Sequence, residues 1–282
     1  SDCIECFAGK YIDVPGSNSS TDCIDCMAGK YVEVTGSDNA TECSDCVAGK
    51  YVQSEGSDHE SDCILCGTGK YSSVTGSFDS GDCTNCVAGK FMEDEGSDAE
   101  SDCVLCGAGK YSTVVGSSAA DDCSDCVAGK YLETAGGDEE ADCALCGAGK
   151  YSIEVGSFSE GDCTDCIAGK YLETLGGDEE ADCVLCGVGL YSTVVGSFSQ
   201  GDCTECVAGK YVESEGSDEE VDCILCGAGR YSTVVGSFSR YDCIECFVGK
   251  YIDVAGSNNP TDCIDCVAGK YVEGTGSALE SK

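Results

Sequence analysis

The sequence predicts a small disulfide-rich, mainly β fold, built as an elongated solenoid or rod of fourteen 20-residue hairpin repeats. Two observations support this fold class. The 282 residues include 28 cysteines, a frequency typical of disulfide scaffolds. The pattern S/T-D-C-x-x-C-x-A-G-K-Y-x-x-x-x-G-S-x-x-x begins at Ser1 and recurs every twenty residues up to Thr261. A period this short indicates repeats that contact mainly their neighbours, either as a continuous solenoid or as beads on a rod.

The array spans residues 1–280 and leaves 281–282 as a tail. Between residues 41 and 240 two kinds of repeat alternate, which gives a 40-residue period. Residues 1–40 closely match 241–280, and the first and thirteenth repeats share fifteen of twenty residues. A 240-residue period is therefore superimposed on the shorter ones, as expected of a segment from a longer, polymer-like protein.

Each repeat predicts one small hairpin. Residues 30–34 alternate in polarity as a strand does, residues 36–39 form a Gly-Ser-Asp-Asn turn cluster, and the next repeat continues with a short extended stretch. Gly9 and its equivalents follow the second Cys at a fixed distance, where the backbone must take a positive φ or pass close to a neighbouring disulfide. No 3.6-residue apolar period is present, so we expect no helix.

Twenty residues bury too little apolar surface to offset the entropy of ordering them, so the cysteines must replace a core. Three pairings are open: Cys3 with Cys6 inside each CxxC motif, a ladder that joins Cys6 to Cys23, or a crossed scheme that joins Cys3 to Cys23 and Cys6 to Cys26. We favour the ladder because it closes every repeat identically, in 18-residue loops worth about 3 kcal/mol each. Spacing alone does not fix the connectivity.

The ladder leaves Cys3 and Cys266 without a partner in this chain. It pairs Cys6 with Cys23, Cys26 with Cys43, Cys46 with Cys63, Cys66 with Cys83, Cys86 with Cys103, Cys106 with Cys123, Cys126 with Cys143, Cys146 with Cys163, Cys166 with Cys183, Cys186 with Cys203, Cys206 with Cys223, Cys226 with Cys243 and Cys246 with Cys263.

The run from Cys103 to Ser117, Cys-x-x-Cys-x-Ala-Gly-Lys-Tyr-Ser-x-x-x-Gly-Ser, resembles the ephrin-receptor-like cysteine-rich repeat. That module is similar to the simplest cysteine-rich modules of tumour-necrosis-factor receptors, and long tandem copies occur in secreted proteins of microalgae and other protists. The resemblance covers all fourteen repeats. It implies a disulfide between the Cys before the Gly-x-Tyr hairpin and the Cys after it, which here are Cys6 and Cys23.

Charge and motifs exclude several classes of function. Fifty-three acids against fifteen bases give a net charge of −38, which argues against binding to nucleic acid and to anionic membranes. No apolar run approaches the 18 residues of a membrane span, so we expect no membrane insertion. His59 is the only histidine and has no nucleophile partner. No catalytic or cofactor-binding constellation has a unique location, so we expect no enzyme activity.

Two metal hypotheses remain. The spacing C-x2-C-x16-C-x2-C is also a zinc-site spacing, and a four-cysteine zinc-binding array is an alternative to the ladder. The acid clusters at 138–140, 178–180 and 218–220 lack the spacing of a calcium loop, so we expect weak Ca²⁺ association at most.

Four recurrent positions receive structural interpretations. The Lys at the tenth position pairs with neighbouring acids, and the Tyr at the eleventh packs on each disulfide as an aromatic ladder. Even-numbered repeats between 41 and 240 place Leu at the fifth position and usually Phe at the eighteenth, namely Phe78, Phe158, Phe198 and Phe238. These side chains either fill the joint between two repeats or form an apolar stripe for lateral assembly.

Two N-glycosylation sequons occur in the turn after the second Gly, at Asn18-Ser19-Ser20 and Asn39-Ala40-Thr41. Asn259-Pro260-Thr261 has a Pro at its middle position and is not a sequon. Glycans would agree with the disulfide content, because disulfide-dense arrays belong outside the cytosol.

The leading hypothesis is an extracellular or cell-surface structural protein, a disulfide-stapled rod that self-associates into a filament of an appendage, flagellar hair, wall or matrix. The alternative is a receptor or adhesin stalk that presents a ligand-binding surface. A stalk predicts a local break in the repeat, and the breaks present are small: Phe91-Met92, Ser118-Ala119-Ala120, Leu190 and Arg240-Tyr241.

Overall fold

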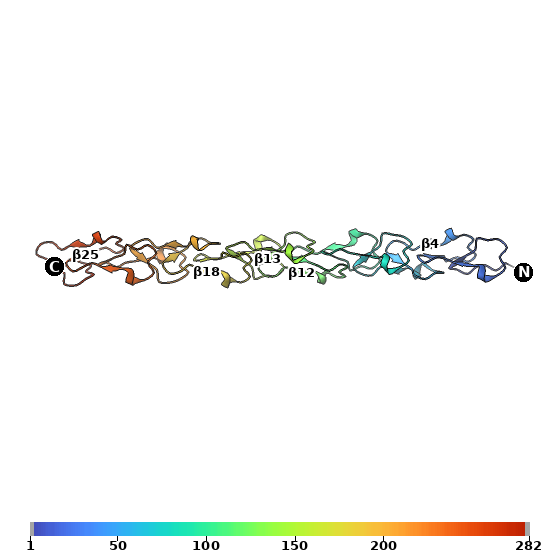
Figure 1. The fold of residues 1–282 in the computed structure, drawn as a ribbon, viewed down its shortest axis with the longest axis horizontal. Coiled ribbons are helices and arrows are strands. Elements are labelled where there is room, and N and C mark those ends of the chain that lie inside the picture. The colour runs from blue at the N-terminus through green and yellow to red at the C-terminus, as the bar shows by residue number, and fades with distance from the viewer. Residues whose placement is uncertain (1–2, 280–282) are drawn as a thin grey trace. The chain divides into compact units, whose positions relative to one another are not determined.

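The computed structural model describes residues 3–279. The described residues form thirteen two-stranded antiparallel hairpins, each with a three-residue 3₁₀ helix between its strands (Figure 1). They divide into two compact units, the first made of Ser1–Cys126 and Leu132–Cys143 and the second of Val127–Tyr131 and Ala144–Lys282. The fold is therefore disulfide-rich and mainly β, as predicted.

The first strands of the hairpins are β1 (Lys10–Tyr11), β3 (Lys30–Tyr31), β5 (Lys50–Tyr51), β7 (Lys70–Tyr71), β9 (Lys90–Phe91), β11 (Lys110–Tyr111), β13 (Lys130–Tyr131), β15 (Lys150–Tyr151), β17 (Lys170–Tyr171), β19 (Leu190–Tyr191), β21 (Lys210–Tyr211), β23 (Arg230–Tyr231) and β25 (Lys250–Tyr251). Their partners are β2 (Ile24–Asp25), β4 (Ser44–Asp45), β6 (Ile64–Leu65), β8 (Thr84–Asn85), β10 (Val104–Leu105), β12 (Ser124–Asp125), β14 (Ala144–Leu145), β16 (Thr164–Asp165), β18 (Val184–Leu185), β20 (Thr204–Glu205), β22 (Ile224–Leu225), β24 (Ile244–Glu245) and β26 (Ile264–Asp265). The 3₁₀ helices are η1 (Ser20–Asp22), η2 (Ala40–Glu42), η3 (Glu60–Asp62), η4 (Ser80–Asp82), η5 (Glu100–Asp102), η6 (Ala120–Asp122), η7 (Glu140–Asp142), η8 (Glu160–Asp162), η9 (Glu180–Asp182), η10 (Gln200–Asp202), η11 (Glu220–Asp222), η12 (Arg240–Asp242) and η13 (Pro260–Asp262).

Each hairpin combines the middle of one repeat with the start of the next. In the first hairpin Lys10 lies opposite Asp25 and Tyr11 opposite Ile24. Fourteen sequence repeats therefore give thirteen complete hairpins. The strand expected over residues 30–34 is only two residues long, because Val32 donates its N–H to the carbonyl of Ser57 in the following repeat, 3.2 Å away, rather than to its own hairpin.

The described residues contain no α-helix, as the missing 3.6-residue period predicts, and the three-residue 3₁₀ helices are an additional element that this pattern does not predict. In every described turn except η2, where the residue is Glu42, an Asp at the second position of the repeat caps the turn. In η3, the Asp62 carboxylate accepts the backbone N–H groups of Asp58 and His59, both at 3.1 Å. These bonds satisfy backbone donors that a short turn leaves without a partner. The turn therefore depends on local capping and not on an apolar period.

Neighbouring repeats inside each compact unit are joined by backbone hydrogen bonds. At the first junction Gly9 donates to Val32 at 2.8 Å, and Cys26 donates back to Gly9 at 2.9 Å. Gly36 donates to the carbonyl of Cys6, also at 2.9 Å. The same bonds recur at later junctions. The repeats within a unit therefore stack as in a solenoid and are not separate beads.

Gly9 and most of its equivalents are required by the backbone conformation and by a neighbouring backbone segment, not by a disulfide. The φ of Gly9 is +84°, which confirms the expected positive φ. A Cβ at this position would overlap the carbonyl oxygen of Gly56, which lies two repeats further along the chain. Of the two expected reasons for a glycine, the positive φ is therefore confirmed, and the close neighbour is another backbone segment and not a disulfide.

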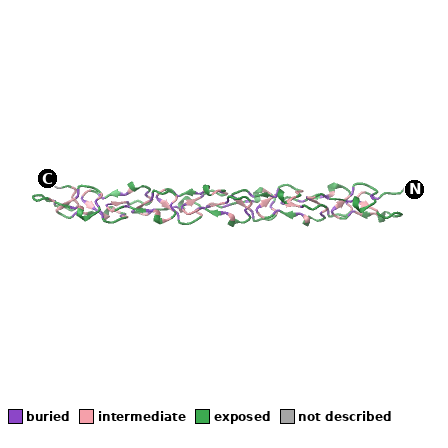
Figure 2. Ribbon diagram, turned by 90° about the horizontal axis from the view of Figure 1, so that it is seen from above, coloured by how far each residue is buried: buried purple, intermediate pink, exposed green. Residues whose placement is uncertain are grey.

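The apolar core of the described residues is divided into seven small clusters, each at a junction whose twelfth-position residue is apolar. One cluster consists of Cys26, Val32 and Cys43, with Tyr11 packed against it. Figure 2 shows the buried residues as short segments spread along each unit, with exposed loops around them. Because no cluster is larger than a few residues, the disulfides must supply much of what a continuous core supplies elsewhere.

Candidate functional site

The structure contains the disulfide ladder. Each bridge joins the second Cys of one repeat to the first Cys of the next, seventeen residues later, from Cys6–Cys23 to Cys246–Cys263. The Cα atoms are 5.6–5.8 Å apart, within the usual range for disulfides. Neither the CxxC nor the crossed pairing is formed. Thirteen bridges use 26 of the 28 thiols, so no set of four thiolates remains for a zinc site among the described residues.

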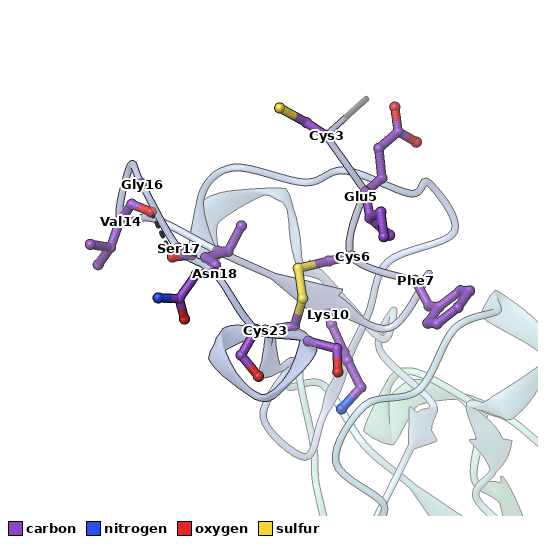
Figure 3. A pocket seen from close by; sticks show the side chains of 14 residues that line it. Cys3, Glu5, Cys6, Phe7, Lys10, Val14, Gly16, Ser17, Asn18 and Cys23 are labelled. Atoms are coloured by element: carbon purple, nitrogen blue, oxygen red, sulfur yellow. Dashed lines mark hydrogen bonds between the residues drawn. A yellow bond between two sulfur atoms is a disulfide. The ribbon is translucent and has the colours of Figure 1, made fainter. Parts of the chain in front are cut away.

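Cys3 and Cys266 are the free cysteines of the described residues. Figure 3 shows the Cys3 thiol apart from the Cys6–Cys23 bridge, in a pocket that Phe7 and Asn18 also line. In later junctions the tyrosine of the preceding repeat packs on the bridge, as Tyr11 does on the next bridge. The first bridge has no preceding tyrosine in this chain.

The tyrosines of the eleventh position form the expected aromatic contacts with the bridges. Tyr31 packs against the cluster of Cys46, Val52 and Cys63, and the same contact recurs for Tyr71, Tyr111, Tyr151 and Tyr191. Burial, together with the carboxylates of Glu60 and Glu33, raises the pKa of Tyr31. These rings are therefore part of the junction and not a free binding platform.

From the second repeat onward, the residue at the twelfth position of the repeat is buried at the junction. Between residues 41 and 240 it alternates between an apolar side chain and a hydrogen-bonded Ser. In the even repeats between residues 41 and 240 it is a buried Ser, as in Ser72, whose hydroxyl lies 3.2 Å from that of Ser77. In odd repeats it is apolar, and in the two repeats that have Leu there the seventeenth residue is Gly. Leu172 faces Gly177, whose added Cβ would lie 2.7 Å from the Leu172 Cδ2, whereas the smaller Val212 is accompanied by Ser217.

This pairing predicts a compensating double substitution. Gly177→Ser should destabilise its junction by about 1–3 kcal/mol, because the new Cβ meets Leu172 in a filled core. Adding Leu172→Val should restore most of this loss, since the pair then matches Val212 and Ser217. Local hydrogen exchange of the Leu172 N–H, which is bonded to Ser197 at 3.0 Å, measures the effect. Equal exchange in the single and double variants would contradict the size match.

The basic side chains of the tenth position pair with acids, and the partner depends on the next repeat. Where the fifth position of the next repeat is acidic, it is the partner, as in Lys30–Asp45 at 2.6 Å. Where it is Leu, the partner is the Glu at the twentieth position, as in Lys170–Glu180 at 3.1 Å, with Leu185 opposite Lys170 in the hairpin. These pairs are largely exposed, so each is worth under about 1 kcal/mol.

Arg230 and Glu245 form an ion pair at 2.7 Å, and the Glu245 carboxylate also accepts a hydrogen bond from Thr275. Two interactions lower the pKa of Glu245. The first is the hydrogen bond from the Thr275 hydroxyl, and the second is the hydrogen bond and positive charge of the Arg230 guanidinium. The folded state therefore favours the ionised carboxylate. This contribution to stability is present above the ordinary Glu pKa and is lost as the pH falls through the lowered value.

Titration of the Glu245 carboxylate by NMR tests this. We expect its midpoint below that of an ordinary Glu, and we expect Thr275→Val to move the midpoint upward, because the hydroxyl donor is then lost. A Thr275→Ser variant, which keeps the hydroxyl, is the control. A midpoint in the ordinary range that neither variant changes would contradict the assignment.

The phenylalanines of the eighteenth position do not fill the joint between repeats. The rings of Phe78, Phe158, Phe198 and Phe238 are 57–62% exposed. The fifth-position leucines are closer to the joint: the Leu65 Cδ2 would lie 2.5 Å from a Cβ added at Gly96 of the next repeat. The joint interpretation is therefore wrong for the Phe rings and holds in part for Leu, which remains 41–48% exposed.

Backbone N–H groups of the acid clusters take part in capping the 3₁₀ helices that follow. Asp142 accepts the N–H groups of Asp138 and Glu139 at 2.8 and 3.1 Å. Over residues 3–279 no three Asp, Glu, His or Cys side chains are grouped so that they could hold a metal ion. His59 is the N-cap of η3, and its Nδ1 accepts the N–H of Ser61 at 3.1 Å. The one histidine of the sequence therefore has a structural role.

Asn18 and Asn39 are exposed and lie in the turns that lead into η1 and η2. Of the helices described in the structure, none is long and apolar enough to cross a membrane.

Comparison with known proteins identifies the module. The family model described as tyrosine-protein kinase ephrin type A/B receptor-like matches residues 169–223 and 196–243. No curated protein matches the sequence significantly. The matched family is a cysteine-rich module typical of non-catalytic domains, and such repeats with many disulfides suggest an extracellular protein. The chain is thus a disulfide-rich array of ephrin receptor-like cysteine-rich repeats in tandem, joined by a regular disulfide ladder.

Proposed function

We propose that this chain is an extracellular structural protein that forms a disulfide-stapled rod or filament of a surface appendage, flagellar hair, wall or matrix. One observation carries the proposal: the same hairpin, bridge and junction hydrogen bonds recur from repeat to repeat. A mechanical element uses such uniformity, because every repeat then bears load in the same way. A binding or catalytic protein instead needs one place that differs from the rest.

The covalent ladder supports this role. Each bridge closes an 18-residue loop that the chain-entropy model values at about 3 kcal/mol. The closed loops are linked by junction hydrogen bonds such as Gly149 to Leu172 at 2.8 Å. Force applied along the array would act on these closed loops, which cannot unravel while the bridges hold.

Electron microscopy of the purified chain tests the proposal. Fourteen repeats stacked at the roughly 10 Å spacing of packed sheets give a particle on the order of 140 Å long. Extended particles or filaments are the expected result. A compact globule would contradict the proposal.

Lateral association is the second part of the proposal and makes its own prediction. The net charge of −38 amounts to about 2.7 charges per repeat, close enough together to repel within the ~8 Å Debye length of physiological salt. We therefore expect filaments to bundle or lengthen with millimolar Ca²⁺ or high salt, and to disperse in EDTA at low ionic strength. Light scattering and electron microscopy measure both effects.

The exposed rings of Phe158, Phe198 and Phe238 are the proposed lateral contact. Changing all three to Ser should weaken bundling while leaving the monomer folded, because the rings are mostly exposed. The matched control changes three exposed apolar residues of the seventh position in odd repeats, Val127, Ile167 and Val207, to Ser. Equal loss of bundling in both triple variants, or failure of the Phe variant to form its disulfides, would contradict the stripe.

A receptor or adhesin stalk is the second candidate. It is favoured by one break in the repeat, where the Arg240 guanidinium lies 4.9 Å from the centroid of the exposed Tyr241 ring. A stalk needs no self-association. Extended particles that stay monomeric in Ca²⁺ and high salt would favour this function over the filament.

A further inference from the structure

We propose that Asn39 and Asn18 carry N-linked glycans, and that Asn259, in the corresponding turn of another repeat, does not. The proposal rests on the extracellular location proposed above. It adds two covalent modification sites to the first two repeats. All three asparagines lie in the turn that precedes the 3₁₀ helix, at the eighteenth or nineteenth position of the repeat.

Asn39 presents its amide nitrogen for modification. It is exposed, its backbone is extended with φ −151° and ψ 143°, and it is the N-cap of η2. Its Oδ1 accepts the backbone N–H of Thr41 at 2.9 Å. Among the described residues none bonds to its Nδ2, which is the atom that a glycan would use. Capping and glycosylation therefore use different atoms of the same side chain.

The modification leaves the turn intact. The donor is a lipid-linked oligosaccharide pyrophosphate, used by an oligosaccharyltransferase of the secretory pathway. The C1–O bond of the donor breaks and its electrons leave with the lipid pyrophosphate. A C1–N bond forms to Asn39 Nδ2, which gives up one proton to a base. Nδ2 keeps its second hydrogen and Oδ1 keeps its lone pairs, so the bond from the Thr41 N–H remains.

Asn18 offers a second acceptor one position earlier. It is exposed, and Figure 3 shows its side chain at the edge of the pocket, on the same turn as Ser17. Here the neighbouring Ser19 takes over the capping, since its hydroxyl accepts the N–H of Thr21 at 3.2 Å. The Asn18 side chain has no capping role, so its amide is available. The sequon continues through Ser19 to Ser20.

Asn259 is an internal comparison provided by the chain. It caps η13 as Asn39 caps η2, with its Oδ1 accepting the N–H of Thr261 at the same 2.9 Å. Its tripeptide differs from that of Asn39 only by Pro260 in place of Ala40. A Pro at the middle position abolishes the sequon. Asn39 and Asn259 thus occupy corresponding exposed turns, but only Asn39 lies in a sequon.

The experiment expresses the whole chain behind a secretion signal in a eukaryotic cell. The secreted protein is treated with peptide N-glycosidase, which converts each glycosylated Asn to Asp, and is then mapped by mass spectrometry. We expect conversion at Asn39 and Asn18 and none at Asn259. Two variants sharpen the test. Thr41→Ala removes the sequon but keeps the capping bond, which uses the backbone N–H of residue 41, and Pro260→Ala creates a sequon at Asn259.

Thr41→Ala should lose the modification at Asn39 with no change in disulfide formation, and Pro260→Ala should gain one at Asn259. The proposal is overturned if secreted wild-type protein is unmodified at Asn39 and Asn18, whether or not Pro260→Ala gains a glycan, or if Asn259 is modified in the wild type. Failure of the protein to be secreted with its disulfides formed would count instead against the extracellular location.

Discussion

Reduction of the thirteen disulfides is expected to abolish the folded structure of the whole array. Each bridge closes an 18-residue loop worth about 3 kcal/mol in the chain-entropy model. Thirteen such terms exceed the roughly 5–15 kcal/mol by which whole domains are usually stable. The clusters of buried residues, such as Cys166, Leu172 and Cys183, are too small to replace them. Circular dichroism and thermal unfolding in excess reductant measure the loss.

The control for this prediction is the oxidised chain in EDTA, which should keep its transition because the bridges and not a metal hold the repeats. A cooperative transition that survives in reductant with EDTA present would show that the junctions fold without the ladder. That outcome would contradict the proposed source of stability.

Gly149→Ala is expected to disrupt its junction more than any surface substitution. The residue has φ +80°, where a side chain costs about 1–2 kcal/mol. The new Cβ would also overlap the carbonyl oxygen of Gly196, and forced overlap in a packed site adds about 1–3 kcal/mol. Hydrogen exchange should therefore accelerate at the two N–H groups of this junction, Gly149 to Leu172 and Cys166 to Gly149, both 2.8 Å bonds.

Gly147→Ala is the matched control, two residues away in the same repeat. A Cβ at Gly147 meets nothing within 4 Å, and the residue has no positive φ. Its substitution should change stability by less than about 0.5 kcal/mol. If both variants exchange at the same rate, the close approach between Gly149 and Gly196 does not stabilise the array.

The sequence predicts the hairpin and the positive φ of Gly9 because these depend on patterns within twenty residues, and it predicts the tyrosine contacts because an aromatic ring recurs with every bridge. It could not show that Gly9 lies against Gly56, because a contact between alternate repeats depends on how each repeat is turned relative to the last. Strand length was overestimated for the same reason: Val32 bonds to the next repeat and leaves its own hairpin.

The 3₁₀ helices were missed because three-residue turns carry no hydrophobic period. The Asp of the second position, as in Asp62, was the available signal, since an Asp three residues after the N-cap is typical of a capped turn. The pairing of Lys170 with Glu180 also follows from the sequence once the hairpin register is known. The residue opposite Lys170 is Leu185, which cannot form an ion pair, so the Lys pairs with the Glu at the twentieth position instead. The exposure of Phe158 did not follow, because the spacing is compatible with either the joint or the surface.

Peptide mapping by mass spectrometry under non-reducing conditions measures the disulfide connectivity on which the fold of the array depends. We expect each linked pair to join the second Cys of one repeat to the first Cys of the next, such as Cys146 to Cys163. Linkage of Cys143 to Cys146 inside one motif, crossed linkage of Cys146 to Cys166, or free thiols that bind zinc would each contradict this connectivity.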